Sequence, residues 1–333
     1  MRQDNKRSEA IDRLQKGRRR RQLVIAGLGL GVAAAATLAP RRVNAAQREL
    51  RVGYQKGALS IIRSRGVLEK RLAPLGASVK WVGFTAGPVQ LEALGAGSID
   101  FGDVGEAPPV FSQAAGTPLV YVAATVARPR VEAVLVPGGS AIRQVADLKG
   151  KRVAFNKGSN VHYFLVKLLE KHGLRVGDVS PVFLAPADAR AAFERGVVDA
   201  WVIWEPYLAA AEQTLQARIL ADAGGVVKNR AYYFSSRQFA RGNADLLKIA
   251  IEELDRLDGW AKSRPDDYAA ELAAILGLPG NVVEVAVRRY DFGTLPITRA
   301  ILDEQQQIAD TFLDLKLIPR RIDLREAAPP WLA

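Results

Sequence analysis

The feature that most constrains the fold of this chain is an alternation of short apolar runs with longer helical stretches from residue 48 onward. Leu50–Tyr54 and Val79–Phe84 are typical of strands, and a segment with helical periodicity lies between them. Leu119–Thr125 and Val131–Val136 are apolar at most positions, as expected of strands that are buried on both faces. Strands and helices that alternate in this way predict an α/β fold.

The alternation falls into two sets. A turn-rich break at Pro137-Gly138-Gly139-Ser140 ends the first set, and a strand at Arg152–Phe155 opens the second. After a further strand near Tyr232–Ser235 the chain is expected to be mostly helical. A chain of 333 residues, 49% of them hydrophobic, is long enough for about two domains.

Small residues or prolines follow several predicted strands where the next helix begins. These junctions are Gly57, Gly87-Pro88, Pro108-Pro109, Pro186 and Pro206. In open α/β sheets, ligands bind at the carboxyl ends of the strands, where helix N-termini present free N–H groups. Each junction alone is compatible with a simple turn. Together they predict a cleft that binds an anion.

The N-terminus has the three parts of an export signal. A polar stretch ends in Arg18–Arg21, an apolar run covers Leu23–Leu38, and small residues follow at Ala45-Ala46. This pattern predicts a cleaved signal peptide over residues 1–45. Its paired arginines fit the twin-arginine type, and the Sec route stays open as the alternative. An uncleaved membrane anchor is the alternative, although the apolar run is short for a membrane span.

Composition excludes several classes of function. Residues 1–45 hold eleven basic and three acidic residues, so most of the net charge of +12 lies in the predicted signal and nucleic-acid binding is not expected. The chain has no cysteine, which excludes thiolate metal sites, a cysteine nucleophile and a lipidated cysteine tether. An exported protein without a tether is useful where an outer barrier retains it, which favours a periplasm.

Signatures of catalysis are also missing. The only histidines are His162 and His172, ten residues apart, and no HExxH, GxSxG or phosphate-loop motif occurs. We therefore expect no catalytic residue, no metal and no cofactor, and predict that the chain is not an enzyme.

Four stretches in order resemble the aliphatic sulfonate-binding proteins of ABC importers, within the wider family of sulfonate, taurine and nitrate periplasmic binding proteins. They are VGYQKG at residues 52–57, LGAGSIDFGD and GEAPP within residues 87–109, DLKGKRVAF and KGSNVH within residues 147–162, and PADARAAF and GVVDAWVIWEPY within residues 186–207. The similarity runs from about residue 48 to 325.

The resemblance implies a two-lobed, type II periplasmic binding protein of the α/β class, with a hinge of two crossover strands that closes on its ligand. Residues 48–136 and 236–325 would form lobe one, and residues 137–235 lobe two. The crossover strands would be Val131–Val136 and Tyr232–Ser236.

The resemblance also implies a ligand site. A sulfonate stays ionised at physiological pH and needs converging donors, which Gln55 and the Gly158–Asn160 loop would supply, and an apolar wall, for which Trp204 is a candidate. His162 is either a ligand contact or a surface histidine, and Arg190 either contacts the ligand or braces the cleft. The candidate residues are Gln55, Lys56, Gly57, Gly87, Pro88, Gly105, Glu106, Gly158, Ser159, Asn160, His162, Arg190, Trp204, Glu205 and Tyr232.

The implied function is that of a monomeric periplasmic receptor that captures alkanesulfonates for sulfur acquisition and delivers them to an ABC permease with a cytoplasmic ATPase. Glu106 and Asn160 stand where family members often carry Asp and Ser. A carboxylate at Glu106 would suit a ligand amine, so taurine, or another organosulfur or nitrate-type anion, stays open as the ligand. Desulfinases and thiamine-pyrimidine synthases share the fold, but they depend on cysteines that this chain lacks.

Overall fold

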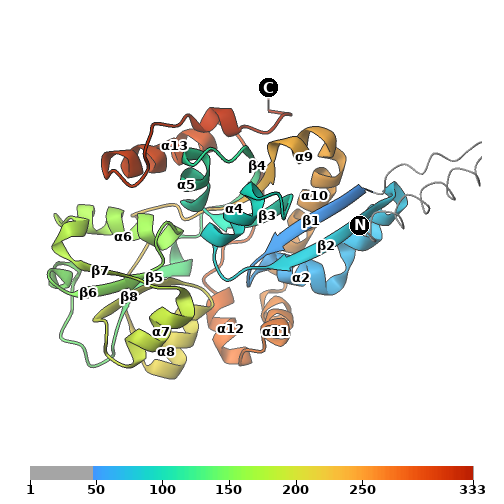
Figure 1. Cartoon of the computed structure of the whole chain (residues 1–333). Helices are drawn as coiled ribbons and strands as arrows, with labels where there is room; N and C mark the ends of the chain where they lie inside the picture. Colours follow the sequence, from blue (N-terminus) through green and yellow to red (C-terminus); the bar gives the residue numbers. More distant parts are fainter. Residues whose placement is uncertain (1–47, 333) are drawn as a thin grey trace, which may run out of the picture. The chain divides into compact units, whose positions relative to one another are not determined.

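The computed structural model describes residues 48–332, so the predicted signal peptide lies outside the described residues. Two mixed sheets carry helices on both faces, which confirms the predicted α/β class (Figure 1). Within residues 48–332, none of the helices combines the length and the apolar character that a membrane crossing requires.

Sheet one has the strand order β11-β4-β10-β3-β1-β2. Its strands are β1 (Arg48–Tyr54), β2 (Ala77–Gly83), β3 (Phe101–Gly105), β4 (Leu119–Thr125), β10 (Ala231–Ser236) and β11 (Thr294–Pro296). β1 pairs in parallel with β2 and β3, and β10 runs antiparallel between β3 and β4. On one face pack α2 (Ala58–Arg65), α3 (Val67–Leu72), α10 (Ala244–Ser263) and α11 (Pro265–Leu276). On the other pack α4 (Gly87–Gly95), α5 (Pro108–Ala114) and α13 (Arg299–Asp314).

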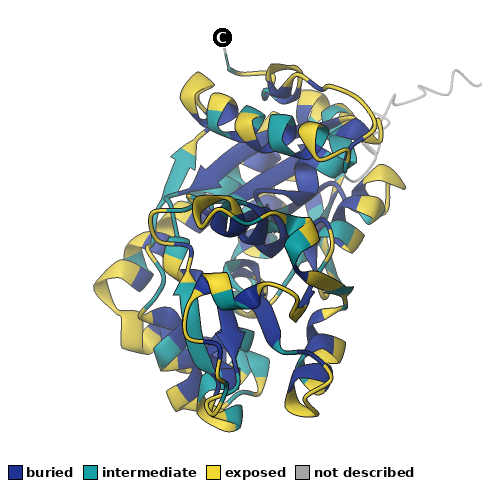
Figure 2. Ribbon diagram, turned by 90° about the vertical axis from the view of Figure 1, so that its left-hand side faces the viewer, coloured by how far each residue is buried: buried dark blue, intermediate teal, exposed yellow. Residues whose placement is uncertain are grey.

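Sheet two has the order β7-β6-β8-β5-β9. Its strands are β5 (Glu132–Val136), β6 (Arg152–Phe155), β7 (Ser180–Phe183), β8 (Ala200–Trp204) and β9 (Arg218–Asp222). Val202 on β8 packs with α6 (Asn160–Lys171), whereas Trp201 and Ile203 pack with α7 (Pro186–Glu194) and α8 (Tyr207–Leu215). Because helices cover both faces, β8 is apolar throughout, and the central strands of both sheets are buried (Figure 2).

Two short connections join the sheets. Residues 126–131 lead from β4 to β5, and residues 223–230 lead from β9 back to β10. The N–H of Arg128 donates to the carbonyl of Lys228 at 3.0 Å, and the Asn229 side chain donates to the carbonyl of Arg128 at 3.1 Å. The two connections therefore lie side by side, directly before the strands β5 and β10 that the sequence suggested as crossovers.

Local differences from the predicted elements have simple causes. The single helix expected between residues 57 and 72 is divided into α2 and α3 at Gly66, which has φ 59° and ends the first helix in the left-handed conformation. The pattern did not predict β9 and β11, since each is an edge strand without a continuous buried run. The helical C-terminal part also contains α9 (Arg237–Gly242) and α12 (Gly280–Val287).

Candidate functional site

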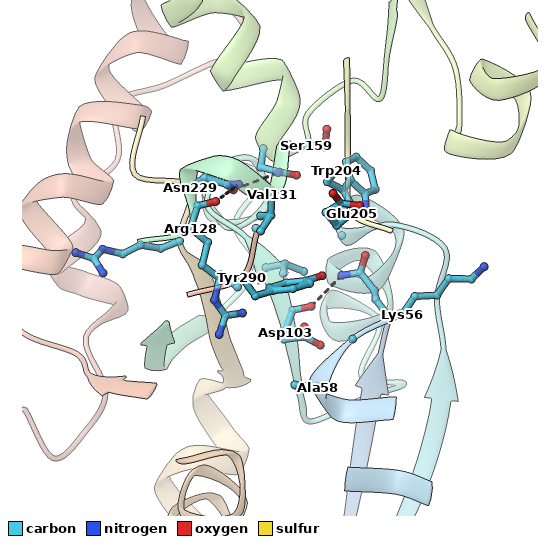
Figure 3. A pocket seen from close by; sticks show the side chains of 18 of the residues that line it. Lys56, Ala58, Asp103, Arg128, Val131, Ser159, Trp204, Glu205, Asn229 and Tyr290 are labelled. Carbon is cyan, nitrogen blue, oxygen red and sulfur yellow. Dashed lines mark hydrogen bonds between the residues drawn. The ribbon is translucent and has the colours of Figure 1, made fainter. Parts of the chain in front are cut away.

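A cleft of about 180 Å³ is lined by residues of both sheets (Figure 3). Its walls come from the segments that follow β1, β2 and β3 in sheet one and β6 and β8 in sheet two, with Arg128 and Asn229 from the connections. Pockets for drug-sized ligands typically measure roughly 300–1,000 Å³. This cleft therefore suits a ligand that is smaller than a typical drug molecule.

Three helices begin at the cleft. Gly57 at the start of α2, Gly87 at the start of α4 and Ser159 at the start of α6 all line it. No N-cap side chain of these helices accepts a hydrogen bond from the first turn. Their first N–H groups thus have no partner within the helix and are suited to an anion. Pro108, at the start of α5, also lines the cleft, whereas Pro186 does not.

The turn that leads into α6 is shaped by a neutral histidine. Gly158 has φ 76°, and its N–H donates to Nδ1 of His162 at 3.2 Å. His162 is 2% exposed and packs against Phe155 and Phe312, with ring centroids 5.0 and 5.6 Å away. Burial lowers the pKa of His162 to about 4, so the ring is neutral at pH 7. Neither Gly158 nor His162 lines the cleft, and the amide of Gly158 is already bonded.

Polar side chains at the start of α6 are also engaged within the protein. Asn160 donates to Glu132 Oε2 at 2.6 Å and to Asn229 Oδ1 at 3.3 Å, and the Ser159 hydroxyl donates to the carbonyl of Asn156 at 2.7 Å. Asn160 also meets sheet one at Gly105, where an added Cβ would lie 2.8 Å from the Asn160 Cβ. Only glycine at position 105 permits this close approach.

Glu106 is buried away from the cleft. It is 3% exposed, and its Oε2 accepts the N–H of Arg230 at 3.2 Å. Burial raises the pKa of Glu106 to about 8, and burial together with the nearby carboxyl of Glu106 raises the pKa of Glu132 well above its ordinary value. Glu106 is therefore protonated at neutral pH, and the expectation that it offers a carboxylate charge to a ligand is not met.

The rim of the cleft connects sheet-one loops with sheet-two helices. Trp204 lines the cleft in a T-shaped contact with Tyr207, at 6.4 Å and 87° between the rings. Lys56 Nζ, from the loop after β1, lies 5.4 Å from the Tyr207 ring centroid. Glu205, whose pKa is raised by burial, pairs at 2.5 Å with Arg289, which follows α12.

Three further predicted residues lie outside the cleft. Pro88 is in the first turn of α4. Arg190 donates to Thr214 Oγ1 at 3.0 Å, which joins α7 to α8. Tyr232 is 1% exposed and packs against Tyr121, while its neighbour Tyr233 lines the cleft. Successive side chains of a strand point to opposite faces of the sheet. The predicted residue, Tyr232, therefore points away from the cleft, and the next residue, Tyr233, points into it.

Several cleft residues were not predicted from the sequence. Among them are Asp103, Arg128, Tyr233, Asp258, Tyr268 and Tyr290. Asp103 lies inside the predicted LGAGSIDFGD motif, and its carbonyl accepts a hydrogen bond from Gln55 Nε2 at 3.0 Å. The guanidinium of Arg128 lies 3.7 Å from Asp258 and 5.6 Å from the Tyr290 ring centroid. Asp258, Tyr268 and Tyr290 come from distant helical segments that carry no local signal of a site.

Comparisons with known proteins agree with this geometry. A family model described as NMT1/THI5 like matches residues 82–267. An aliphatic sulfonates-binding protein of Escherichia coli K12 is 40% identical over 280 residues, which cover 83% of this chain and 87% of that protein. The alkanesulfonate-binding protein SsuA from Xanthomonas axonopodis pv. citri, solved bound to MOPS, is 39% identical with a TM-score of 0.80, over 86% of this chain and 98% of that one. SsuA from Escherichia coli, a periplasmic aliphatic sulphonate binding protein, is 39% identical with a TM-score of 0.78, over 85% and 97%. These likenesses confirm the predicted two-lobed fold.

Proposed function

Since this chain belongs to the family of aliphatic sulfonate-binding proteins, as its motifs predicted, we propose that it is a receptor that captures alkanesulfonates in the cleft between its two sheets. The observation that carries the proposal is the meeting of three helix N-termini, those of α2, α4 and α6, at one small cleft. A sulfonate spreads one negative charge over three oxygens. It therefore needs several N–H donors and no proton-transfer partner.

The donors that we assign to the sulfonate are mainly backbone amides. The side chains of Asn160 and His162 are used inside the protein, so we assign them to positioning the start of α6, where Asn160 also lines the cleft. Gln55 lines the cleft, and its side-chain amide donates at present to the carbonyl of Asp103. Hydrogen bonds to a charged group contribute roughly 1.5–3 kcal/mol each.

The carbon tail would lie against Trp204. This ring lines the cleft at the end of β8 and is held by its contact with Tyr207. Burying each methylene of a tail contributes about 0.8 kcal/mol. We expect affinity to rise with tail length until the cleft is full.

We further propose the cellular setting. The protein would act as a monomer in the periplasm after removal of residues 1–45, and would deliver its ligand to an ABC permease with a cytoplasmic ATPase. The sequence put the lobe boundaries at residues 136 and 236, but β5 belongs to sheet two and β10 to sheet one. Residues 48–125 and 231–325 would therefore form lobe one, and residues 132–222 lobe two. The paired connections at 126–131 and 223–230 would bend as the lobes close.

Calorimetric titration of the mature chain tests the proposal. The panel is ethanesulfonate, longer alkanesulfonates, taurine, nitrate and sulfate. We expect micromolar or tighter binding of a sulfonate, about −8 kcal/mol or better, and weaker binding of nitrate. Absence of binding to every sulfur anion would overturn the assignment of the ligand.

A pair of tryptophan variants tests whether Trp204 forms the apolar wall for the carbon tail. Trp204→Ala should remove most of the gain in affinity per added methylene. Trp331→Ala is the control, because Trp331 is 45% exposed and does not line the cleft. Equal effects of the two substitutions would contradict the role of Trp204.

A further inference from the structure

Most of the charged residues that line the cleft form ion pairs within the protein. Its charged lining residues are Lys56, Asp103, Arg128, Glu205, Arg230 and Asp258. Arg128 pairs with Asp258 at 3.7 Å, Arg230 with Glu304 at 3.0 Å, and Glu205 with Arg289 at 2.5 Å. Among the residues that the structure describes, Lys56 and Asp103 are the lining charges without an ion-pair partner.

Asp103 is the inner of these two charges. Lys56 is exposed at the rim, whereas Asp103 Oδ1 is buried and has no hydrogen-bond partner among residues 48–332. Burial raises the pKa of Asp103 to about 6 and the charge of Arg128 opposes this rise, so the side chain is mostly ionised at neutral pH. A buried carboxylate without a partner is costly, and a cation from a ligand would offset that cost.

Tyrosine rings surround this carboxylate. Asp103 on β3 lies opposite Tyr233 on the neighbouring antiparallel strand β10. Tyr268 and Tyr290 line the same cleft, and burial raises the pKa values of all three tyrosines, with a smaller contribution from the charge of Asp103. Figure 3 shows Tyr290 directly beside Asp103. Aromatic faces next to a carboxylate attract an organic ammonium group.

This end of the cleft is distinct from the start of α4. Phe101, two residues before Asp103 on β3, stacks on Tyr233 in the core beneath α10 and α11. Val104 points to the opposite face of sheet one, where Gly87 of α4 lies against it. A ligand that spans the carboxyl edge of sheet one therefore meets the first N–H groups of α4 on one face. On the other face it meets the carboxylate of Asp103 with its tyrosine rings, on the side where α2 packs.

We propose that the cleft selects sulfonates that carry an ammonium group, and that Asp103 with Tyr233, Tyr268 and Tyr290 binds the ammonium end. The inference rests on the proposed function, because it assumes that the sulfonate occupies the helix N-termini. It makes Asp103 the residue that decides between amino-substituted and plain alkanesulfonates.

The test is calorimetry at pH 7.5 with ligand pairs of matched length. The pairs are taurine against ethanesulfonate, and 3-aminopropanesulfonate against propanesulfonate. At least one amino compound should bind about tenfold or more tighter than its plain partner, as expected for a new charge-assisted contact. Plain sulfonates that bind as tightly as the amino compounds would overturn the inference and leave the proposed function intact. No binding in either series would overturn both.

Substitution then assigns the effect to Asp103. Asp103→Asn keeps the shape, and should remove the preference for the amino compounds while it changes the affinity for plain sulfonates by less than about threefold. Asp188→Asn, at an exposed position on α7, is the control and should leave the preference unchanged. An equal loss for both members of each pair would mean that Asp103 only supports the fold, and would overturn the inference. The wild-type comparison still decides if Asp103→Asn fails to fold.

Discussion

Two segments at the cleft treat their polar groups in opposite ways. In the turn before α6, the amide of Gly158 and the side chains of Ser159, Asn160 and His162 are engaged within the protein. At the end of β3, Asp103 Oδ1 and Glu106 Oε1 are buried without a partner in the described part of the chain. In the first segment, these internal hydrogen bonds hold the backbone at the start of α6 in place. The second segment holds the unpaired carboxylate of Asp103 and the protonated carboxyl of Glu106. We therefore expect Asp103 to select between ligands and Glu106 to make the stability of the protein depend on pH.

The largest expected effect concerns the pH dependence of stability. Glu106 has a pKa of about 8 in the folded protein, against an ordinary value of 4.5. The folded state therefore holds a proton that the unfolded chain releases above pH 4.5, and the free energy of unfolding should fall as pH rises from 4.5 to 8. The slope from one such group is about 1 kcal/mol per pH unit.

Glu106→Gln should flatten this slope, as measured by urea unfolding at several pH values. Part of the slope should remain, because Glu132 is also buried with a raised pKa. Glu194→Gln, at an exposed position of α7, is the control. An unchanged slope in Glu106→Gln would mean that the end of β3 carries no extra proton and would break the contrast between the two segments.

The second prediction acts where the two segments touch. Gly105→Ala places a Cβ 2.8 Å from that of Asn160 and should hold the sheets apart. Overpacking of this kind costs roughly 1–3 kcal/mol, so sulfonate affinity measured by calorimetry should fall about five- to 150-fold. Gly139→Ala is the matched control, since nothing lies within 4 Å of its added Cβ. Unchanged affinity in Gly105→Ala would show that ligand binding does not need this close contact.

The third prediction tests the support role of the turn before α6. His162→Phe keeps an aromatic ring among the phenylalanines but leaves the N–H of Gly158 without its acceptor. This should cost about 1–3 kcal/mol of unfolding free energy. In the wild type, the lowered pKa of His162 also means that stability is lost as pH falls from 6.5 to 4, and the variant should lack that loss. His172→Phe, at the exposed end of α6, should be nearly neutral.

These contrasts explain how far the sequence could predict the molecule. The strands other than β9 and β11, and the helix junctions at Gly57 and Gly87, were predicted correctly, because periodicity and glycine placement are local properties. His162 was noticed for its position, but its inward orientation depends on Phe312 from a distant helix. Tyr232 was chosen in place of Tyr233 because the local sequence does not reveal which face of β10 meets the cleft. Asp258 and Tyr290 reach the site only through the packing of the C-terminal helices.

The smallest expected effect belongs to a residue that the motifs suggested as a ligand contact. Arg190 bonds Thr214 on the side of α7 that faces α8 and does not line the cleft. Arg190→Ala should therefore change sulfonate affinity by less than about twofold, and stability by about 0.5 kcal/mol or less, as for most surface positions. Titration of Arg190→Ala beside Gly105→Ala and Asp103→Asn compares a residue outside the cleft with residues at its wall. A tenfold loss in Arg190→Ala would move the anion site toward α7 and away from the N-termini of α2, α4 and α6.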